Sequence, residues 1–375
     1  MWKPDIIGAV LNAELDGESG ATAVLESPRP WQSRWVQIAV SVGVVGLIFG
    51  FLFPKLADYG QIWETVEGMT WLEITALCLI ALVNLVGYLP LLIAALPGLG
   101  VREAAVSNFA STAISNTLPG GSALGVGVTV SIQRSFGIPS SEIALGAVIS
   151  GIWNNFAKLG LPVIALGLLA LTGEVGPGLT AAAVIGVAVL AVCIALFAVL
   201  LRSERFAARI GATAERFVGR IAHVLKRTPP RGLAGGAIRF RRRAIGLLRG
   251  RALAITLATI LNNVLLYSVL LVAIRVVGVS DAEVGWIKIL AAFAFVRLIS
   301  AVPVTPGGLG VVELGLTAAL GNGLADPIQN QIAAAVLVYR ALTWFAPIPL
   351  GTASWLLWRA NSSWRHTVDE RRALT

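Results

Sequence analysis

The sequence predicts an all-α polytopic membrane protein, with about six transmembrane spans and two re-entrant helical hairpins arranged as an inverted-topology repeat. Three observations support this: an apolar composition, the distribution of charge between apolar segments, and two similar Pro-Gly-Gly turns inside apolar segments. Hydrophobic residues occupy 56% of the 375 positions, charged residues occupy 13%, and the mean hydropathy is +0.80. Soluble domains contain roughly 25% charged residues, so most of this surface must face lipid.

Six apolar segments are long enough to cross a bilayer as helices, which takes about 20 residues. They lack the alternating pattern of a membrane barrel, and helices and closed barrels are the only structures that satisfy their own backbone in lipid. The expected spans are 35–53, 72–96, 143–171, 179–201, 252–274 and 331–356. Segment 1–34 contains five acidic residues and lacks the apolar core of a signal peptide. We expect it to be a cytosolic, mostly disordered leader.

The charges of the connecting segments predict an orientation. Segment 202–251 carries fourteen Lys and Arg against two Glu, so the positive-inside rule makes it a basic cytosolic loop. The basic tail 357–375 is expected on the same side, which makes both termini cytoplasmic. Acidic residues predominate in the loops expected outside, which are 54–71, 172–178 and 278–286.

Two further apolar segments begin and end on one side of the membrane and are therefore expected to be hairpins. Segment 104–132 lies between Arg102 and Arg134, both assigned to the inside, whereas segment 287–321 begins and ends outside. Residues 104–118 would form a helix of about 22 Å. This is shorter than the ~30 Å hydrocarbon core, as a re-entrant half-helix would be.

Each hairpin tip contains Pro-Gly-Gly, at 119–121 in the first membrane half (35–201) and at 306–308 in the second (252–356). Proline ends a helix, and glycine allows a ligand to approach the backbone. The helix that starts after each turn offers free N–H groups to an anion. In inverted repeats, such broken helices meet near the midplane and form the substrate site. The alternative is that each turn only kinks a transmembrane helix.

Four charged residues lie well inside apolar segments, away from the segment ends: Lys158, Arg297, Glu313 and Arg340. A charge at the bilayer centre costs about 2.5–3.5 kcal/mol, so it normally faces a cavity or a partner. Three cations against one anion predict a site for an anionic headgroup such as phosphate. The expected substrate-binding residues are Asn116, Pro119, Gly120, Gly121, Asn154, Asn155, Lys158, Arg297, Thr305, Pro306, Gly307, Gly308, Gly310, Glu313, Tyr339 and Arg340.

Each of these groups also has a purely structural explanation. Glu313 would then pair with Arg297 or Arg340 only to lock the fold, and Lys158 would extend to the membrane interface. The asparagine pairs 154–155 and 262–263 would form hydrogen bonds between helices.

The basic segment contains a predicted amphipathic helix over 204–227, with apolar residues on one face and arginines on another. Such a helix lies on an anionic leaflet. Positive-inside bias alone also explains most of this charge, and we expect no nucleic-acid partner for the arginine run 241–243. The two cysteines and two histidines lack metal-ligand spacing, and common catalytic motifs are absent. We therefore expect no enzyme activity, metal or cofactor.

Segment Arg297–Gly315 (RLISAVPVTPGGLGVVELG) resembles the lysylphosphatidylglycerol synthase transmembrane-domain family, also called flippase-like, and 305–313 carries its most specific motif. The resemblance covers roughly 35–356. The first-half motif 119–127 departs from the usual pattern, because Gly121 replaces an Arg and no Glu follows. Residue usage is similar to that of actinobacterial members.

The resemblance implies a domain in the bacterial cytoplasmic (inner) membrane that binds and translocates anionic phospholipids or polyprenyl-phosphate-linked lipids. We expect no aminoacyl transferase domain, because only the tail follows the last span. Our main hypothesis is a lipid flippase or transporter. One alternative is a non-transporting scaffold that recruits cell-envelope biosynthesis proteins through the basic loop. Another is a membrane-embedded transferase acting on a lipid-linked sugar or aminoacyl group, which would need a second carboxylate at depth.

Overall fold

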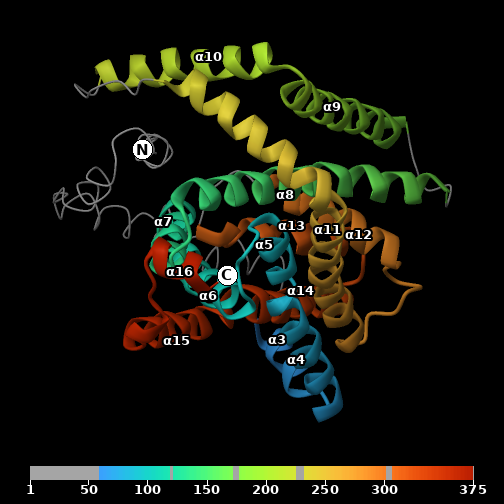
Figure 1. Cartoon of the computed structure of the whole chain (residues 1–375). Helices are drawn as coiled ribbons and strands as arrows, with labels where there is room; N and C mark the ends of the chain where they lie inside the picture. Colours follow the sequence, from blue (N-terminus) through green and yellow to red (C-terminus); the bar gives the residue numbers. More distant parts are fainter. Residues whose placement is uncertain (1–58, 119–120, 172–176, 225–231, 301–305, 375) are drawn as a thin grey trace.

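A computed structural model describes residues 59–118, 121–171, 177–224, 232–300 and 306–374 (Figure 1). Its regular elements are helices, and the described strand pairing is one isolated bridge between Phe136 and His366. The predicted all-α class is therefore confirmed. The leader 1–34 and the first expected span, 35–53, lie outside the described residues.

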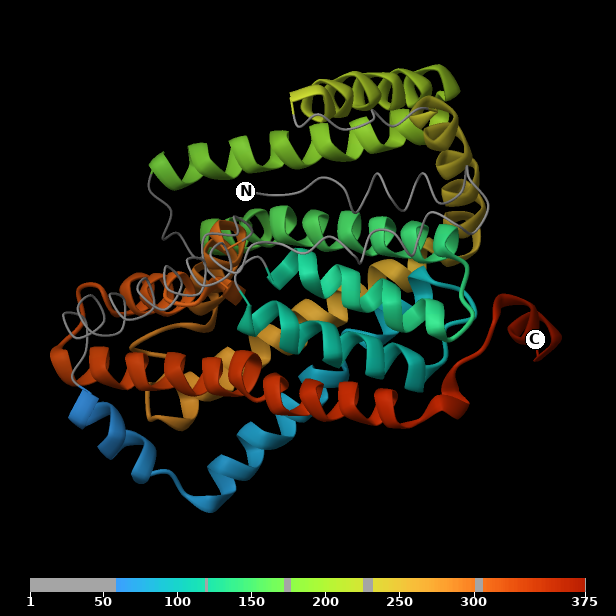
Figure 2. The same cartoon turned by 90° about the vertical axis from the view of Figure 1, so that its left-hand side faces the viewer.

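Five helical segments are long and apolar enough to cross a membrane, which confirms a multi-pass membrane protein. Each overlaps one of the expected spans, because bilayer thickness sets a minimum length that the sequence reveals directly. They are Trp71–Ala95 (α4 Trp71–Val86 and α5 Leu89–Ala95), Ser140–Leu171 (α8), Ala183–Arg202 (in α9, Pro177–Arg202), Gly235–Val276 (in α11, Leu233–Val276) and Asp326–Ala360. Figure 2 shows that the axes of α8, α9 and this last segment are similarly inclined, and that the chain reverses direction between α8 and α9.

The last segment, Asp326–Ala360, changes its winding near its middle. It consists of α14 (Asp326–Arg340), the π-helical turn η5 (Ala341–Phe345) and α15 (Pro347–Ala360). Pro347 and Pro349 lie shortly after the π turn, and a proline cannot donate the backbone hydrogen bond of a regular helix. Single π turns inside long helices are frequent at functional sites.

Both predicted hairpin segments fold as pairs of helices that pack against each other. The first consists of α6 (Val101–Thr117) and α7 (Gly121–Ser135). The second consists of α12 (Trp286–Ile299) and α13 (Val311–Gly321), with the 3₁₀ turn η4 (Pro306–Gly308) before α13. The 17 residues of α6 make about 25 Å of helix, which is less than the hydrocarbon thickness.

The basic segment 202–251 is largely helical. It contains α10 (Glu204–Val224) and the start of α11, so the expected boundary between loop and membrane half at 251–252 falls inside one continuous helix. The 42-residue stretch Gly235–Val276 would be about 63 Å long, roughly twice the hydrocarbon thickness. The arginine-rich first part of α11 therefore extends beyond the lipid core.

The main core lies among α11, α12, α13 and α14, where the buried aliphatic side chains include Leu270, Ile289, Leu316 and Ile332. By contrast, no residue of the apolar window of α9 is buried. The first hairpin is joined to the second half, because α6 packs along α15.

The tail is folded back onto the base of the first hairpin through α16 (Val368–Leu374). The Arg371 guanidinium forms two hydrogen bonds with the Glu103 carboxylate, of 2.8 and 3.1 Å, and also donates to the carbonyls of Gly98 and Phe136. The Thr367 N–H donates to Glu370 at the start of α16 and lowers the pKa of that carboxyl. The remaining short helices are α3 (Tyr59–Glu67) and η6 (Ser362–Trp364).

The contact between α6 and α15 depends on Gly351, where an added Cβ would lie 2.7 Å from the Ala113 Cβ and closer still to the Phe109 carbonyl oxygen. We expect Gly351→Ala to destabilise the protein by about 1–3 kcal/mol through overpacking. Gly167→Ala in α8 is the matched control, because a Cβ there meets no atom within 4 Å. Thermal unfolding in detergent measures both, and equal melting temperatures would contradict the close contact.

Candidate functional site

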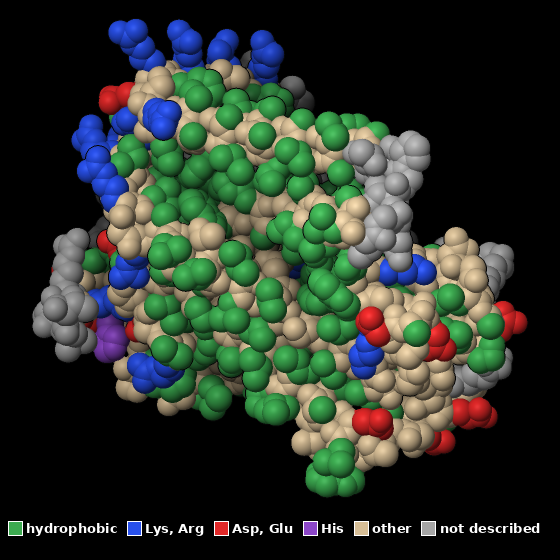
Figure 3. Space-filling view, turned by 90° about the vertical axis from the view of Figure 1, so that its right-hand side faces the viewer, with side chains coloured by type: hydrophobic (Ala, Val, Ile, Leu, Met, Phe, Trp, Pro, Cys, Tyr) green, Lys and Arg blue, Asp and Glu red, His purple; other side chains and the backbone are tan. Residues whose placement is uncertain are grey.

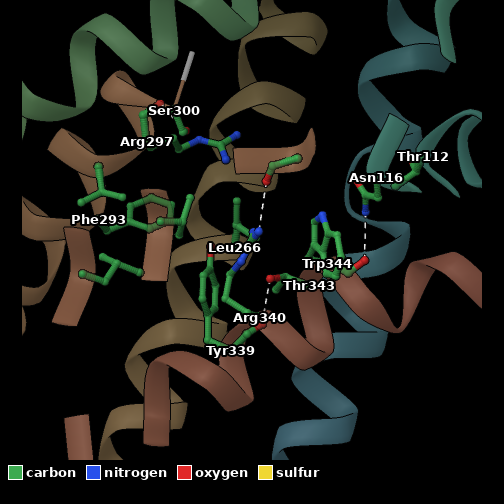
Figure 4. Close-up of a pocket in the computed structure, with 14 residues that line it drawn as sticks. Thr112, Asn116, Leu266, Phe293, Arg297, Ser300, Tyr339, Arg340, Thr343 and Trp344 are labelled. Carbon is green, nitrogen blue, oxygen red and sulfur yellow. Dashed lines mark hydrogen bonds between the residues drawn. The ribbon is translucent and has the colours of Figure 1, made fainter. Parts of the chain in front are cut away.

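The helices on either side of the first Pro-Gly-Gly segment both lie against the second turn, since α6 and α7 each contact η4. Asn116, near the end of α6, donates a hydrogen bond of 2.9 Å from Nδ2 to the carbonyl of Trp344 in the π turn (Figure 4). Its Oδ1 faces Gly307, where an added Cβ would lie 3.2 Å away. One residue of the first hairpin thus reaches both the second turn and η5.

A cavity of about 220 Å³ opens at this meeting point. It is lined by seven helices or helical turns from the two membrane halves, and its described lining contains two arginines and no carboxylate. The lining residues are Thr112, Asn116, Leu266, Phe293, Val296, Arg297, Ser300, Gly307, Val312, Leu316, Tyr339, Arg340, Thr343 and Trp344. Figure 4 shows the guanidinium groups of Arg297 and Arg340 extending inward from opposite walls.

Arg340 forms a buried ion pair with Glu313, with 2.8 Å between Nε and Oε1. The Glu313 side chain is 1% exposed, and its second oxygen accepts the Gly310 N–H at 2.6 Å. Arg340 also donates to the Gly307 carbonyl at 3.0 Å. The pair therefore holds the backbone of the second turn, where Gly307 and Gly310 both adopt positive φ. The sequence left Arg297 and Arg340 as possible partners of Glu313, and in the structure the partner is Arg340.

Arg297 has no carboxylate partner within the described ranges. Its Nε donates to Asn263 Oδ1 at 3.0 Å, and its guanidinium lies 5.8 Å from the centre of the Phe293 ring. Asn263 is itself fixed by a hydrogen bond to the Thr259 carbonyl. Asn263 therefore forms a hydrogen bond between α11 and α12, which is the structural role predicted for the 262–263 pair. The same bond orients Arg297, which lines the cavity.

The polar residues of α8 lie outside the cavity lining. Lys158 is half-buried and makes no hydrogen bond or ion pair within the described part of the chain. It is close enough to Arg297 for the two positive charges to interact, since α8 packs on α12. The side-chain oxygen of Asn154 is buried without a partner, whereas Asn155 is exposed.

Five of the sixteen expected site residues line the cavity, and the others divide into two groups. Those in the lining are Asn116, Arg297, Gly307, Tyr339 and Arg340. Those placed elsewhere are Gly121, Asn154, Asn155, Lys158, Pro306, Gly308, Gly310 and Glu313. Pro119, Gly120 and Thr305 lie outside the described residues.

Trp344 is the main functional candidate that the sequence analysis missed. Its indole Nε1 is buried and has no hydrogen-bond acceptor among the residues that the structure describes, and its ring centre lies 5.7 Å from the Arg340 guanidinium. The nearby Pro347 and Pro349 were a usable signal, because two prolines in an apolar span predict a distorted helix beside them.

The sequence profile of the lysylphosphatidylglycerol synthase TM region matches residues 34–351. The chain belongs to this family. The predicted resemblance is thus confirmed, and the family's region includes both hairpins and every residue that lines the cavity. A search of curated proteins finds no match. Family membership supports a lipid-modification or flippase-like membrane protein.

The buried ion pair gives a prediction about stability. Glu313→Gln should destabilise the protein by about 3–5 kcal/mol, because Arg340 would stay buried without a counter-charge. Removing both charges, in Glu313→Gln with Arg340→Gln, should cost less than the sum of the two single changes.

A thermal-unfolding mutant cycle in detergent measures this coupling. Additive losses would show that the two side chains act independently and would contradict the pair.

Proposed function

We propose that this family member binds the anionic headgroup of a membrane lipid in the cavity and carries the lipid between leaflets. The observation that supports this most directly is Arg297, a cavity-lining cation with no carboxylate partner among the described residues. Arg340 lines the same cavity, while its partner Glu313 is outside the lining. The lining therefore offers positive charge to a ligand.

The chemistry of the lining suits a phosphate group. Guanidinium groups bind phosphate oxygens through two parallel hydrogen bonds, and such charge-assisted bonds are among the strongest in proteins. The Trp344 N–H, which has no acceptor among the described residues, would add a neutral donor beside Arg340. Lys158, from α8, would add positive potential near Arg297.

The size of the cavity limits what enters it. Sites for drug-sized ligands measure about 300–1,000 Å³, so a cavity of about 220 Å³ suits a headgroup phosphate and excludes acyl chains. The apolar part of the lipid would remain in the bilayer. We propose a substrate with one anionic headgroup, either a phospholipid or a polyprenyl-phosphate-linked lipid.

Transport would use the opposed hairpins. If they enter from opposite sides, as the charge distribution predicts, a headgroup between their tips is accessible from either side by a small movement of one hairpin. We place the protein in the bacterial cytoplasmic membrane with both termini in the cytoplasm. A site shared by the two halves is supported by the hydrogen bond between Asn116 and Trp344, which connects them at the cavity.

Arg297 provides the sharper test, because Arg340 also holds the turn. In vesicles containing NBD-labelled phosphatidylglycerol, Arg297→Gln should slow the change in accessibility of the label to dithionite by about tenfold or more. A charge-assisted hydrogen bond contributes about 1.5–3 kcal/mol, which corresponds to at least that factor. Arg359→Gln, an exposed arginine at the end of α15, is the matched control. Unchanged translocation by Arg297→Gln would contradict the headgroup site, and no translocation by the unmodified protein would favour a scaffold.

Trp344→Phe tests the neutral donor alone, because it retains an aromatic ring near Arg340. We expect lipid binding to weaken by about fivefold, as for loss of one hydrogen bond of about 1 kcal/mol. Native mass spectrometry with titrated phosphatidylglycerol measures the affinity. A change in melting temperature with unchanged affinity would instead assign Trp344 to packing.

A further inference from the structure

The amphipathic helix α10 begins at the membrane surface. The span α9 ends at Arg202 and α10 starts at Glu204, so Ser203 alone separates them. No residue in the apolar window of α9 is buried, so much of this span faces outward, although Phe197 packs against Trp153 and Phe156 of α8. The first turn of α10 therefore lies at the level of the lipid headgroups.

Three faces run along α10. Ala207 and Gly211 are buried on the face that packs against the first part of α11. A second face exposes Ile210, Ala214 and Phe217; the phenylalanine is 64% exposed and the isoleucine 43%. The third face exposes arginines at helical spacing, namely Arg205, Arg209, Arg216 and Arg220.

The basic stripe on this third face has no acidic counterpart in the described structure. Arg205, Arg209 and Arg220 form no ion pair there, and the hydrogen bonds of Arg216 stay within α10, to Ala212 and Thr213. Figure 3 shows Lys and Arg side chains in a row along the top of the molecule, where α10 lies, with hydrophobic side chains directly beneath. An apolar face beside a basic face is the arrangement of helices that lie in a membrane interface.

We propose that α10 is a second lipid-binding element, separate from the cavity, that lies in the interface and binds anionic phospholipids of the surrounding leaflet. Ile210 and Phe217 insert between acyl chains, and the four arginines contact lipid phosphates. Charge complementarity selects lipid as the occupant: each basic residue near an anionic membrane surface contributes about 1 kcal/mol, or roughly fivefold in affinity. The position of α10 directly after α9 holds this charge at headgroup height.

The test measures the depth of α10 in the full-length protein. Cys78 and Cys193 are replaced by serine, and an environment-sensitive label is attached at Ala214→Cys on the apolar face or at Thr213→Cys on the basic face. Val189→Cys in α9 reports membrane insertion. The proteins are reconstituted in phosphatidylcholine vesicles with or without phosphatidylglycerol, and quenching is compared between brominated acyl chains and aqueous iodide.

We expect brominated chains to quench the label at 214 when phosphatidylglycerol is present, at least twice as strongly as in its absence, while the label at 213 responds mainly to iodide. Replacing Arg205, Arg209, Arg216 and Arg220 by Gln should remove this dependence on phosphatidylglycerol. Arg359→Gln with Arg365→Gln is the control for lost charge at the end of the chain. Normal lipid quenching at 189 with none at 214 would overturn the proposal and indicate that protein or water covers the face. Equal quenching at 214 by brominated chains with and without phosphatidylglycerol would overturn the proposed recognition of anionic lipid.

Discussion

The structure depends on one constraint: backbone that leaves the helical conformation among membrane spans must find its hydrogen-bond partners within the protein. The second Pro-Gly-Gly turn meets it with a charged pair. Glu313 accepts the Gly310 N–H, Arg340 donates to the Gly307 carbonyl, and the two side chains neutralise each other. The same contacts that hold the turn also bring a guanidinium to the wall of the cavity.

The end of α6, just before the first turn, is held in a different way, and this difference shapes the site. No charged pair acts on its described residues; instead Asn116 reaches across to the Trp344 carbonyl in the π turn. The two halves are therefore alike in their broken helices and unlike in their polar groups. Because the buried Glu313 carboxylate already pairs with Arg340, Arg297 faces the cavity with an amide and an aromatic ring beside it.

Helix lengths and hairpin positions followed from the sequence because bilayer thickness and proline chemistry act locally. Four details could not be predicted in this way. The choice of Glu313 between two cations depends on how α13 approaches α14, and the burial of Lys158 depends on which side of α8 faces the protein. The helix α11 continues through arginine-rich sequence because charge is compatible with helix outside lipid. Trp344 does not stand out in a hydropathy average, although its buried N–H has no acceptor among the described residues.

The docked tail has a practical consequence for anyone handling this protein. Arg371, in α16, supplies the counter-charge for Glu103. It also donates hydrogen bonds to the carbonyls of Gly98 and Phe136 at the base of the first hairpin. An affinity tag or fluorescent fusion attached at Thr375 would begin next to this contact. A purification handle joined directly after α16 therefore needs a flexible spacer that leaves this helix in place.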